Sequence, residues 1–147
     1  MGSEMCIRDR LNVVRDVVAG KRVIVVDDSI VRGTTCKARI HTLREAGAKE
    51  VHLRISAPPI RFPCFYGIDF PHAGELIAAE KSVEEIRRFL GIDSLGYQSV
   101  EGLLAAVPTS RDSYCLACFT GEYPVEVSED MGKYAMETGR RAYDESR

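Results

Sequence analysis

Several features that define other protein classes are missing from this sequence of 147 residues. No apolar run approaches the roughly 20 residues of a membrane span, and no signal-peptide core is evident, so we expect neither a membrane segment nor secretion. The formal net charge of −2 gives no indication of nucleic acid or an acidic membrane as a partner. No Gly-x-x-x-x-Gly-Lys loop is present to support an ATPase. The sequence also lacks internal repeats and low-complexity tracts.

The remaining composition is that of a globular domain with a real core. Hydrophobic residues make up 45% of the chain and charged residues 29%, both ordinary values. Five cysteines without a secretory signal indicate a reducing compartment, and we expect a cytoplasmic location. In that setting, paired cysteines more often belong to metal or redox chemistry than to disulfides.

The most informative stretch begins with a run of β-branched residues, Val23 to Val26. Such a run predicts a strand buried on both faces, as in the middle of a parallel sheet. Asp27 and Asp28 follow where that strand should end. Open α/β sheets bind ligands at this edge, beyond the carboxyl ends of the strands. The alternative is a buried strand ending in solvated acids, as in Walker-B strands or receiver domains.

A phosphate site is predicted directly after the two acids. Gly33 allows the backbone to approach a ligand closely, and Thr34 or Thr35 can cap the helix that follows. The free N–H groups and the dipole of a helix start favour a phosphate. The two carboxylates can accept hydrogen bonds from neighbouring sugar hydroxyls, or share a Mg²⁺ with them. The pattern therefore indicates a phosphorylated sugar as ligand.

The segment 23–35 resembles the phosphoribosyl-pyrophosphate (PRPP) binding motif of type I phosphoribosyltransferases. Within it, the sequence Val-Val-Asp-Asp-Ser-Ile-Val-Arg-Gly-Thr-Thr is similar to the corresponding motif of the amidophosphoribosyltransferase family. The resemblance implies Mg²⁺ at Asp27 and Asp28 and a PRPP site over the whole turn. The residues that it assigns to PRPP are Asp27, Asp28, Ser29, Ile30, Val31, Arg32, Gly33, Thr34 and Thr35.

A second chemical site is the pair Cys115-Leu116-Ala117-Cys118. A lone C-x-x-C is ambiguous between zinc, a redox dithiol and half of an iron–sulfur site. Taken alone, Cys64 is better explained as a small buried hydrophobe. Cys36, just inside the helix after the acids, is expected to be a packed thiol.

The sequence around these cysteines carries a further resemblance. The stretch Cys-Leu-Ala-Cys-Phe-Thr-Gly-Glu-Tyr-Pro, residues 115–124, is similar to the carboxyl-terminal signature of the iron–sulfur-containing branch of the family. Cys64, in Pro-Cys-Phe-Tyr-Gly-Ile-Asp, matches another ligand position of that branch. The resemblance implies a [4Fe–4S] cluster on Cys64, Cys115 and Cys118, with its fourth ligand upstream of this region. We therefore expect these three cysteines to converge on one point.

Strands and helices alternate along the chain, which predicts the α/β class. We expect a helix over 35–46 ended by Gly47, and a strand over 51–55 with one solvated face. A short helix over 75–79 precedes a helix that is capped by Ser82 and Glu85, runs to Leu90 and ends at Gly91. A weak strand over 97–99 and a short helix over 100–107 follow. The strand that begins at Val23, the helix over 35–46 and the strand over 51–55 should together form a right-handed βαβ unit in a parallel sheet. His41 and His52 are expected on the surface. With the resemblance, the prediction is a partial type I phosphoribosyltransferase fold, a parallel sheet with flanking helices, plus a carboxyl-terminal helical and loop segment.

Three regions are expected along the chain. Residues 1–10, including Cys6, do not have the character of a native segment and are interpreted as a leader. Residues 11–110 match the carboxyl-terminal part of the phosphoribosyltransferase domain. Residues 111–147 hold the cysteine pair and a tail that is charged and helix-prone after position 130. The resemblance covers roughly 11–128, and it implies that the family's glutaminase domain and the first half of its transferase domain are not in this sequence.

The implied reaction of the intact family is PRPP, glutamine and water giving phosphoribosylamine, glutamate and pyrophosphate, the first committed step of purine synthesis. Ammonia would come from the glutaminase domain, and a homo-oligomer is expected of the full-length enzyme. No side chain in this sequence is an obvious catalytic nucleophile. Two other hypotheses stay open: a PRPP-binding regulator, which should carry a DNA-binding helix pair and a basic surface, and a structural metal module. Neither has its expected features here.

Overall fold

The computed structural model describes residues 13–68, 73–108 and 110–125. The predicted leader over 1–10 and the tail after 130 lie outside the described residues. The elements in chain order are α2 (Arg15–Val18), β1 (Arg22–Asp27), α3 (Thr34–Glu45), β2 (Glu50–Ile55), the 3₁₀ turn η1 (Ala73–Glu75), α4 (Ile77–Glu80), α5 (Val83–Leu90), β3 (Ser94–Tyr97), α6 (Val100–Ala105), η2 (Arg111–Ser113) and α7 (Ala117–Thr120). None of the described helices is long and apolar enough to cross a lipid bilayer.

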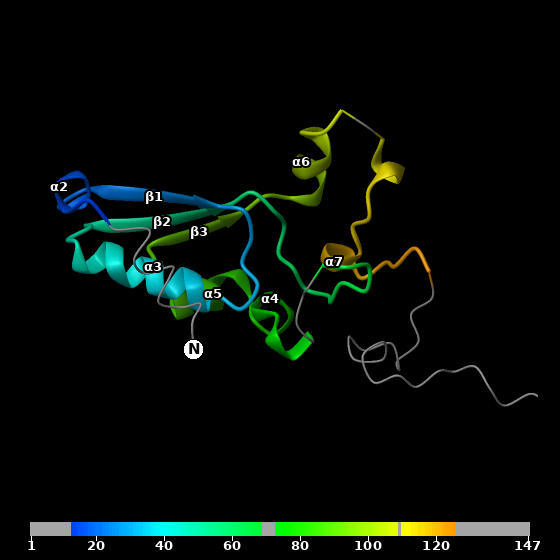
Figure 1. Ribbon diagram of the computed structural model, residues 1–147, viewed down its shortest axis with the longest axis horizontal. Coiled ribbons are helices and arrows are strands. Elements are labelled where there is room, and N and C mark those ends of the chain that lie inside the picture. Colours follow the sequence, from blue (N-terminus) through cyan, green and yellow to red (C-terminus); the bar gives the residue numbers. More distant parts are fainter. Residues whose placement is uncertain (1–12, 69–72, 109, 126–147) are drawn as a thin grey trace, which may run out of the picture.

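The three strands form one parallel sheet in the order β1-β2-β3. Val23 of β1 pairs with Val51 of β2, and Ile55 of β2 pairs with Tyr97 of β3. The helices α3 and α5 lie together on one face of this sheet (Figure 1). The predicted α/β class and parallel sheet are therefore confirmed.

The core lies between the sheet and these two helices. Val51, Leu53 and Ile55, the alternate residues of β2, are all buried. They meet Ile40 of α3 and Ile86 of α5, which the helical period places on the inner faces. This alternation in β2 confirms the predicted strand with one buried face.

The expectation that β1 is buried on both faces is wrong. Ile24 and Val26 are 67% and 72% exposed, whereas Val23 and Val25 pack against the core. In this chain β1 is an edge strand, and α3 and α5 cover only the face opposite to Ile24 and Val26. Continuous β-branched runs show that a segment favours a strand, but not which faces are covered.

The helix ends follow local chemistry with one exception. Ser82 and Glu85 form the predicted capping box of α5, and Gly91 ends that helix with φ 70°. Neither Thr34 nor Thr35 caps α3, however. Gly33 is the N-cap in a left-handed conformation, and no side chain caps that end. The prediction of a threonine cap is therefore wrong, because the turn enters the helix through a positive φ that a β-branched residue disfavours.

The third strand begins earlier than expected, and the helix after it begins at Val100 as expected but ends at Ala105. β3 runs over Ser94–Tyr97, not 97–99, because its pairing with β2 decides its position although Ser94 and Gly96 have little strand propensity. Ser99 instead caps α6, accepting the Gly102 N–H at 2.9 Å.

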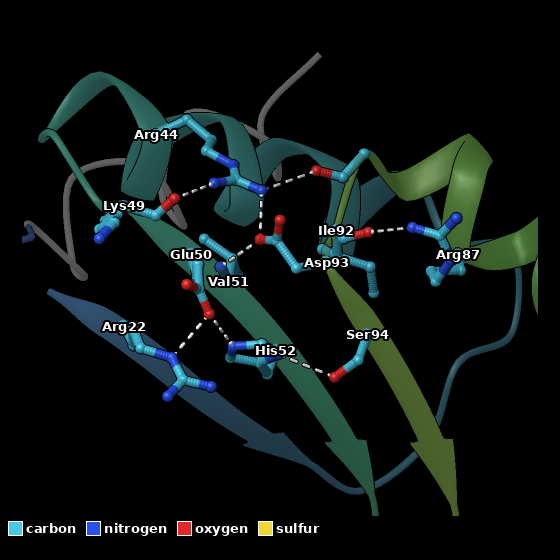
Figure 2. Close-up of polar contacts among 11 residues, drawn as sticks. Arg22, Arg44, Lys49, Glu50, Val51, His52, Arg87, Ile92, Asp93 and Ser94 are labelled. Atoms are coloured by element: carbon cyan, nitrogen blue, oxygen red, sulfur yellow. Dashed lines mark hydrogen bonds and ion pairs between the residues drawn. The ribbon is translucent and has the colours of Figure 1, made fainter.

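His41 is exposed, as predicted, and it pairs with Glu45, whereas the expected surface position of His52 is wrong. Its side chain is only 14% exposed. Its Nδ1 lies 2.8 Å from the Ser94 hydroxyl and its Nε2 lies 3.0 Å from a Glu50 carboxylate oxygen, two contacts drawn in Figure 2. The ring is enclosed because β2 is the central strand, with Ser94 on the neighbouring strand β3 and Glu50 two residues earlier on β2.

Asp93 joins the helix layer to the sheet. Its carboxylate accepts the Val51 N–H at 2.7 Å and an Arg44 guanidinium N–H at 2.6 Å (Figure 2). The hydrogen bond from the Val51 N–H is the main cause that holds the pKa of Asp93 below its ordinary value, and the bond from Arg44 is a smaller one. The contact anchors the amino end of β2, whose carboxyl end lies at the site described next.

Candidate functional site

A hollow of about 290 Å³ lies at the carboxyl end of β1. It is lined by the nine residues that the sequence assigned to PRPP, together with Cys36 and Arg39. The turn after β1 runs from the sheet to the start of α3 (Figure 1). The structure thus brings the whole predicted motif around one concavity, where a parallel sheet presents its strand ends.

The two acids of the motif are held differently. The carboxylate of Asp27 accepts the Asp28 N–H on Oδ1 at 3.1 Å and the Arg39 guanidinium on Oδ2 at 3.0 Å. The Asp28 carboxylate accepts the Ser29 N–H at 2.9 Å. Asp27 is partly buried and Asp28 is exposed. The pair is therefore accessible from the hollow, with Asp27 the more tightly held.

Backbone bonds fix the acids at the end of the sheet. The carbonyls of Asp27 and Asp28 accept the N–H groups of Ser56 and Ala57, each at 3.0 Å. These two residues continue directly from β2. The main chain of both acids is thus anchored to the segment that follows β2, and its position does not depend on flexible side chains.

Gly33 brings the turn close to the helices behind it. Its φ is 80°, and a Cβ at this position would lie 3.1 Å from Ile77 Cδ1 and 3.3 Å from Phe89 Cε1. Both the backbone conformation and the crowding exclude a larger residue without adjustment. The glycine at this position is therefore explained by the close packing of Ile77 and Phe89 as well as by the access that it gives to a ligand.

The turn is also supported from behind by residues that the sequence did not single out. The Ile77 N–H donates to the Val31 carbonyl at 2.9 Å, and Ile30 is 2% exposed. Arg32 Nε donates to a Glu75 carboxylate oxygen at 2.8 Å. No local pattern indicates Glu75, because its partner lies 43 positions away. Arg39 could have been found, since it follows Cys36 by three positions on the helix face that meets Asp27.

The loop that contains Cys64 meets the segment that contains the cysteine pair. The N–H groups of Arg61 and Phe62 donate to the Cys118 carbonyl at 2.9 and 3.1 Å. The Tyr123 hydroxyl donates to the Pro63 carbonyl at 2.8 Å. The expected approach of these two distant segments is therefore present.

The cysteines of these two segments interact electrostatically. Burial raises the pKa of the Cys118 thiol, and the nearby Cys64 and Cys115 raise it further. All four described cysteines are free. Within the part of the chain that the structure describes, no group of three or more His, Cys, Asp or Glu residues is placed to hold a metal ion. Thiols suit an iron–sulfur centre chemically, but these three do not complete a four-thiolate site.

Cys36 is a buried thiol that donates to Asp27 Oδ2 over 3.8 Å. Burial, and then the Asp27 charge, raises its pKa to about 11. The prediction of a packed thiol is confirmed.

The carboxylates of Asp27 and Asp28 suit Mg²⁺, because that ion binds through one or two carboxylates plus substrate oxygens rather than through a complete protein cage.

No protein-family model matches the chain, whereas the comparison with curated proteins gives consistent matches. An amidophosphoribosyltransferase of Bacillus subtilis is 56% identical over 131 residues, which is 86% of this chain, and one of Synechococcus elongatus is 50% identical over 137 residues, which is 92%. The chain spans about 28% of the length of these relatives.

Two solved structures share the fold. One, described as the allosteric regulatory enzyme of purine biosynthesis, superimposes with a TM-score of 0.76 at 48% identity, over 93% of this chain and 31% of that chain. The other is the glutamine PRPP amidotransferase of B. subtilis in complex with ADP and GMP, with a TM-score of 0.76 at 49% identity over 92% of this chain and 32% of that chain.

Proposed function

The chain is a member of the amidophosphoribosyltransferase family over the segment that it spans, and we propose that this segment binds PRPP in the hollow after β1. The observation that carries the proposal is that the motif residues 27–35 surround a single concavity at the carboxyl end of a parallel strand. The hollow offers two carboxylates at one end and a helix start at the other. These are the groups that a ribose with a terminal phosphate requires.

Each part of the site has a separate task in this proposal. The first N–H groups of α3, with the Thr34 and Thr35 hydroxyls, hold the terminal phosphate. Asp27 and Asp28 accept hydrogen bonds from the ribose hydroxyls or share a Mg²⁺ with them. A Mg²⁺ held at these carboxylates would supply the positive charge that neutralises the pyrophosphate leaving group. The carboxylates also lie beside the positive charge that develops on the ribose as pyrophosphate departs, so their contribution is positioning and electrostatics.

We further propose that the complete enzyme to which the segment corresponds makes phosphoribosylamine from PRPP, glutamine and water. Ammonia would reach the ribose from the glutaminase domain of that enzyme, which we expect to be a homo-oligomer. The 147 residues alone should not complete the reaction, because the relatives are more than three times as long and a reacting centre must be closed against water.

The three cysteines are the second part of the proposal. Cys64, Cys115 and Cys118 would ligate iron, with the fourth thiolate supplied from outside the described residues. Anaerobic reconstitution with iron and sulfide tests this idea through the metal content of the purified chain. Iron that is retained by the wild type and by Cys36→Ala, but lost in Cys64→Ala and Cys118→Ala, supports it. Equal iron content in all four proteins contradicts it, and zinc in place of iron favours a structural metal site.

Ligand selectivity tests the PRPP site itself. We expect calorimetry to detect PRPP binding in the presence of Mg²⁺, weaker binding of ribose 5-phosphate, and the weakest binding of inorganic pyrophosphate, which lacks the ribose that Asp27 and Asp28 would recognise. Inorganic pyrophosphate bound as tightly as PRPP would contradict the proposal, because pyrophosphate has no ribose and its tight binding would show a general phosphate site.

A further inference from the structure

Asp27 is restrained at both of its carboxylate oxygens. Oδ1 accepts the Asp28 N–H, and Oδ2 accepts both the Arg39 guanidinium at 3.0 Å and the Cys36 thiol at 3.8 Å. Its side chain is 22% exposed, and that of Arg39 is 43% exposed. A carboxylate has about four acceptor sites. Three protein donors therefore leave Asp27 with room for about one further hydrogen bond.

Asp28 has a different environment although it is the next residue. Its carboxylate accepts the Ser29 N–H at 2.9 Å, and the residue is exposed. Over residues 13–68, 73–108 and 110–125, no ion pair joins Asp28 to a Lys, Arg or His. Asp28 thus keeps an uncompensated negative charge in the hollow, whereas the charge of Asp27 is balanced by Arg39.

We propose that Arg39 is a positioning residue that divides the work of the two acids, so that Asp27 receives a ribose hydroxyl and Asp28 receives the metal ion. This inference rests on the proposed PRPP site and adds a residue to it. A divalent cation favours the carboxylate whose charge is not already balanced. A hydroxyl needs only an acceptor in a fixed direction, and the guanidinium provides that direction through its rigid geometry.

The position of Arg39 fits this assignment. It lies one helical turn after Cys36 on α3, and both residues line the hollow. The helix that offers its amino end to a phosphate therefore also carries the cation that holds Asp27. The orientation of the acid is in this way tied to the same element that would bind the phosphate end of the sugar.

The substitution Arg39→Ala should move two affinities in opposite directions. Without the guanidinium, Asp27 Oδ2 is released and the hollow gains one negative charge. Mn²⁺, which prefers the same oxygen ligands as Mg²⁺ and can be followed by its paramagnetic resonance signal, should then bind about fivefold more tightly. The affinity for PRPP at saturating Mg²⁺ should fall about fivefold or more, since a fixed acceptor has been lost.

Matched variants separate this role from a purely structural one. Arg39→Lys should restore the Mn²⁺ affinity, because it returns the charge, but only part of the PRPP affinity, because an ammonium lacks the planar fork. Arg88→Ala removes an exposed arginine that pairs with Glu84 on α5, and it should change neither affinity. If Arg39 only braces the helix, Arg39→Ala weakens both ligands or neither, and that result overturns the inference.

The two levels of the proposal can fail separately. Wild-type protein that binds Mn²⁺ but not PRPP contradicts the proposed function, while the Mn²⁺ affinities of Arg39→Ala and Arg39→Lys still decide the role of Arg39. Wild-type protein that binds neither contradicts both. Asp28→Asn provides the last check: it should remove most of the Mn²⁺ binding, and undiminished binding would show that Asp28 is not the metal-binding acid.

Discussion

The Arg61 N–H donates to the carbonyl oxygen of Cys118 at 2.9 Å, and so joins the loop of Cys64 to the cysteine pair. The same loop begins a few residues after Ser56, whose N–H is bonded to the Asp27 carbonyl. One short stretch of chain therefore runs from the acid pair to the cysteines. The two sites that the sequence predicts separately are connected through continuous backbone.

The substitution Gly33→Ala tests the tight turn at the hollow. Both Gly33 and Gly91 have positive φ, but a Cβ at Gly91 would meet nothing within 4 Å. We expect Gly91→Ala to cost about 1–2 kcal/mol of unfolding free energy and Gly33→Ala about 1 kcal/mol more, because it also crowds Ile77 and Phe89. Only Gly33→Ala should weaken PRPP binding. Thermal denaturation with ligand titration checks this, and equal effects of the two variants would contradict it.

Cys36 should make the stability of the fold depend on alkaline pH. Burial raises its pKa from 9.0 to about 11, so folding favours the protonated thiol. This contribution is complete below pH 9 and is lost as the pH rises towards 11. The decline of the melting temperature over this range should therefore be shallower in Cys36→Ala. The exposed Cys115 is the control, and an unchanged slope in Cys36→Ala would show that the buried thiol stays protonated for another reason.

The exposed face of β1 should promote association of the isolated chain. Ile24 and Val26 are largely exposed on an edge strand of a parallel sheet, a kind of sheet that is usually covered on both faces. We expect the double variant Ile24→Thr with Val26→Thr to lower the average mass in light scattering and to leave the melting temperature nearly unchanged.

Val51→Thr serves as the control for that experiment, since Val51 is fully buried. An unpaired hydroxyl at this position should cost about 1–3 kcal/mol of unfolding free energy. A wild-type chain that remains monomeric at high concentration would show that the β1 face does not drive association.

The sequence predicts local chemistry better than it predicts surroundings. The capping box of Ser82 and Glu85 and the acids at the end of β1 are where they were expected, because each depends only on neighbouring residues. His52 and Ile24 were misjudged because their burial depends on which strands and helices lie beside them. Arg39 was missed although the helical period places it on the same face as Cys36, because spacing alone does not show what that face meets. Its partner Asp27 lies twelve positions away, across the turn.

The resemblance to a family supplied what local patterns could not. A C-x-x-C motif alone leaves zinc, redox and iron–sulfur chemistry open, and Cys64 alone suggests packing. The backbone contacts between their two segments agree with the family pattern. The separation of the three sulfurs as metal ligands stays a prediction, because ligand geometry depends on a metal and on a fourth thiolate.

The central claim is that Asp27 and Asp28 belong to a PRPP site, and one titration tests it most directly. PRPP is added in the presence of Mg²⁺ to the wild type, to Asp27→Asn with Asp28→Asn, and to a charge-matched control, Glu45→Gln with Glu101→Gln, at two exposed acids. We predict that the first double variant loses at least about tenfold in affinity, since two charge-assisted contacts are weakened, while the control keeps the wild-type value. All three proteins should remain folded, because the acids lie outside the apolar core. Equal affinity of the three proteins for PRPP would contradict the account.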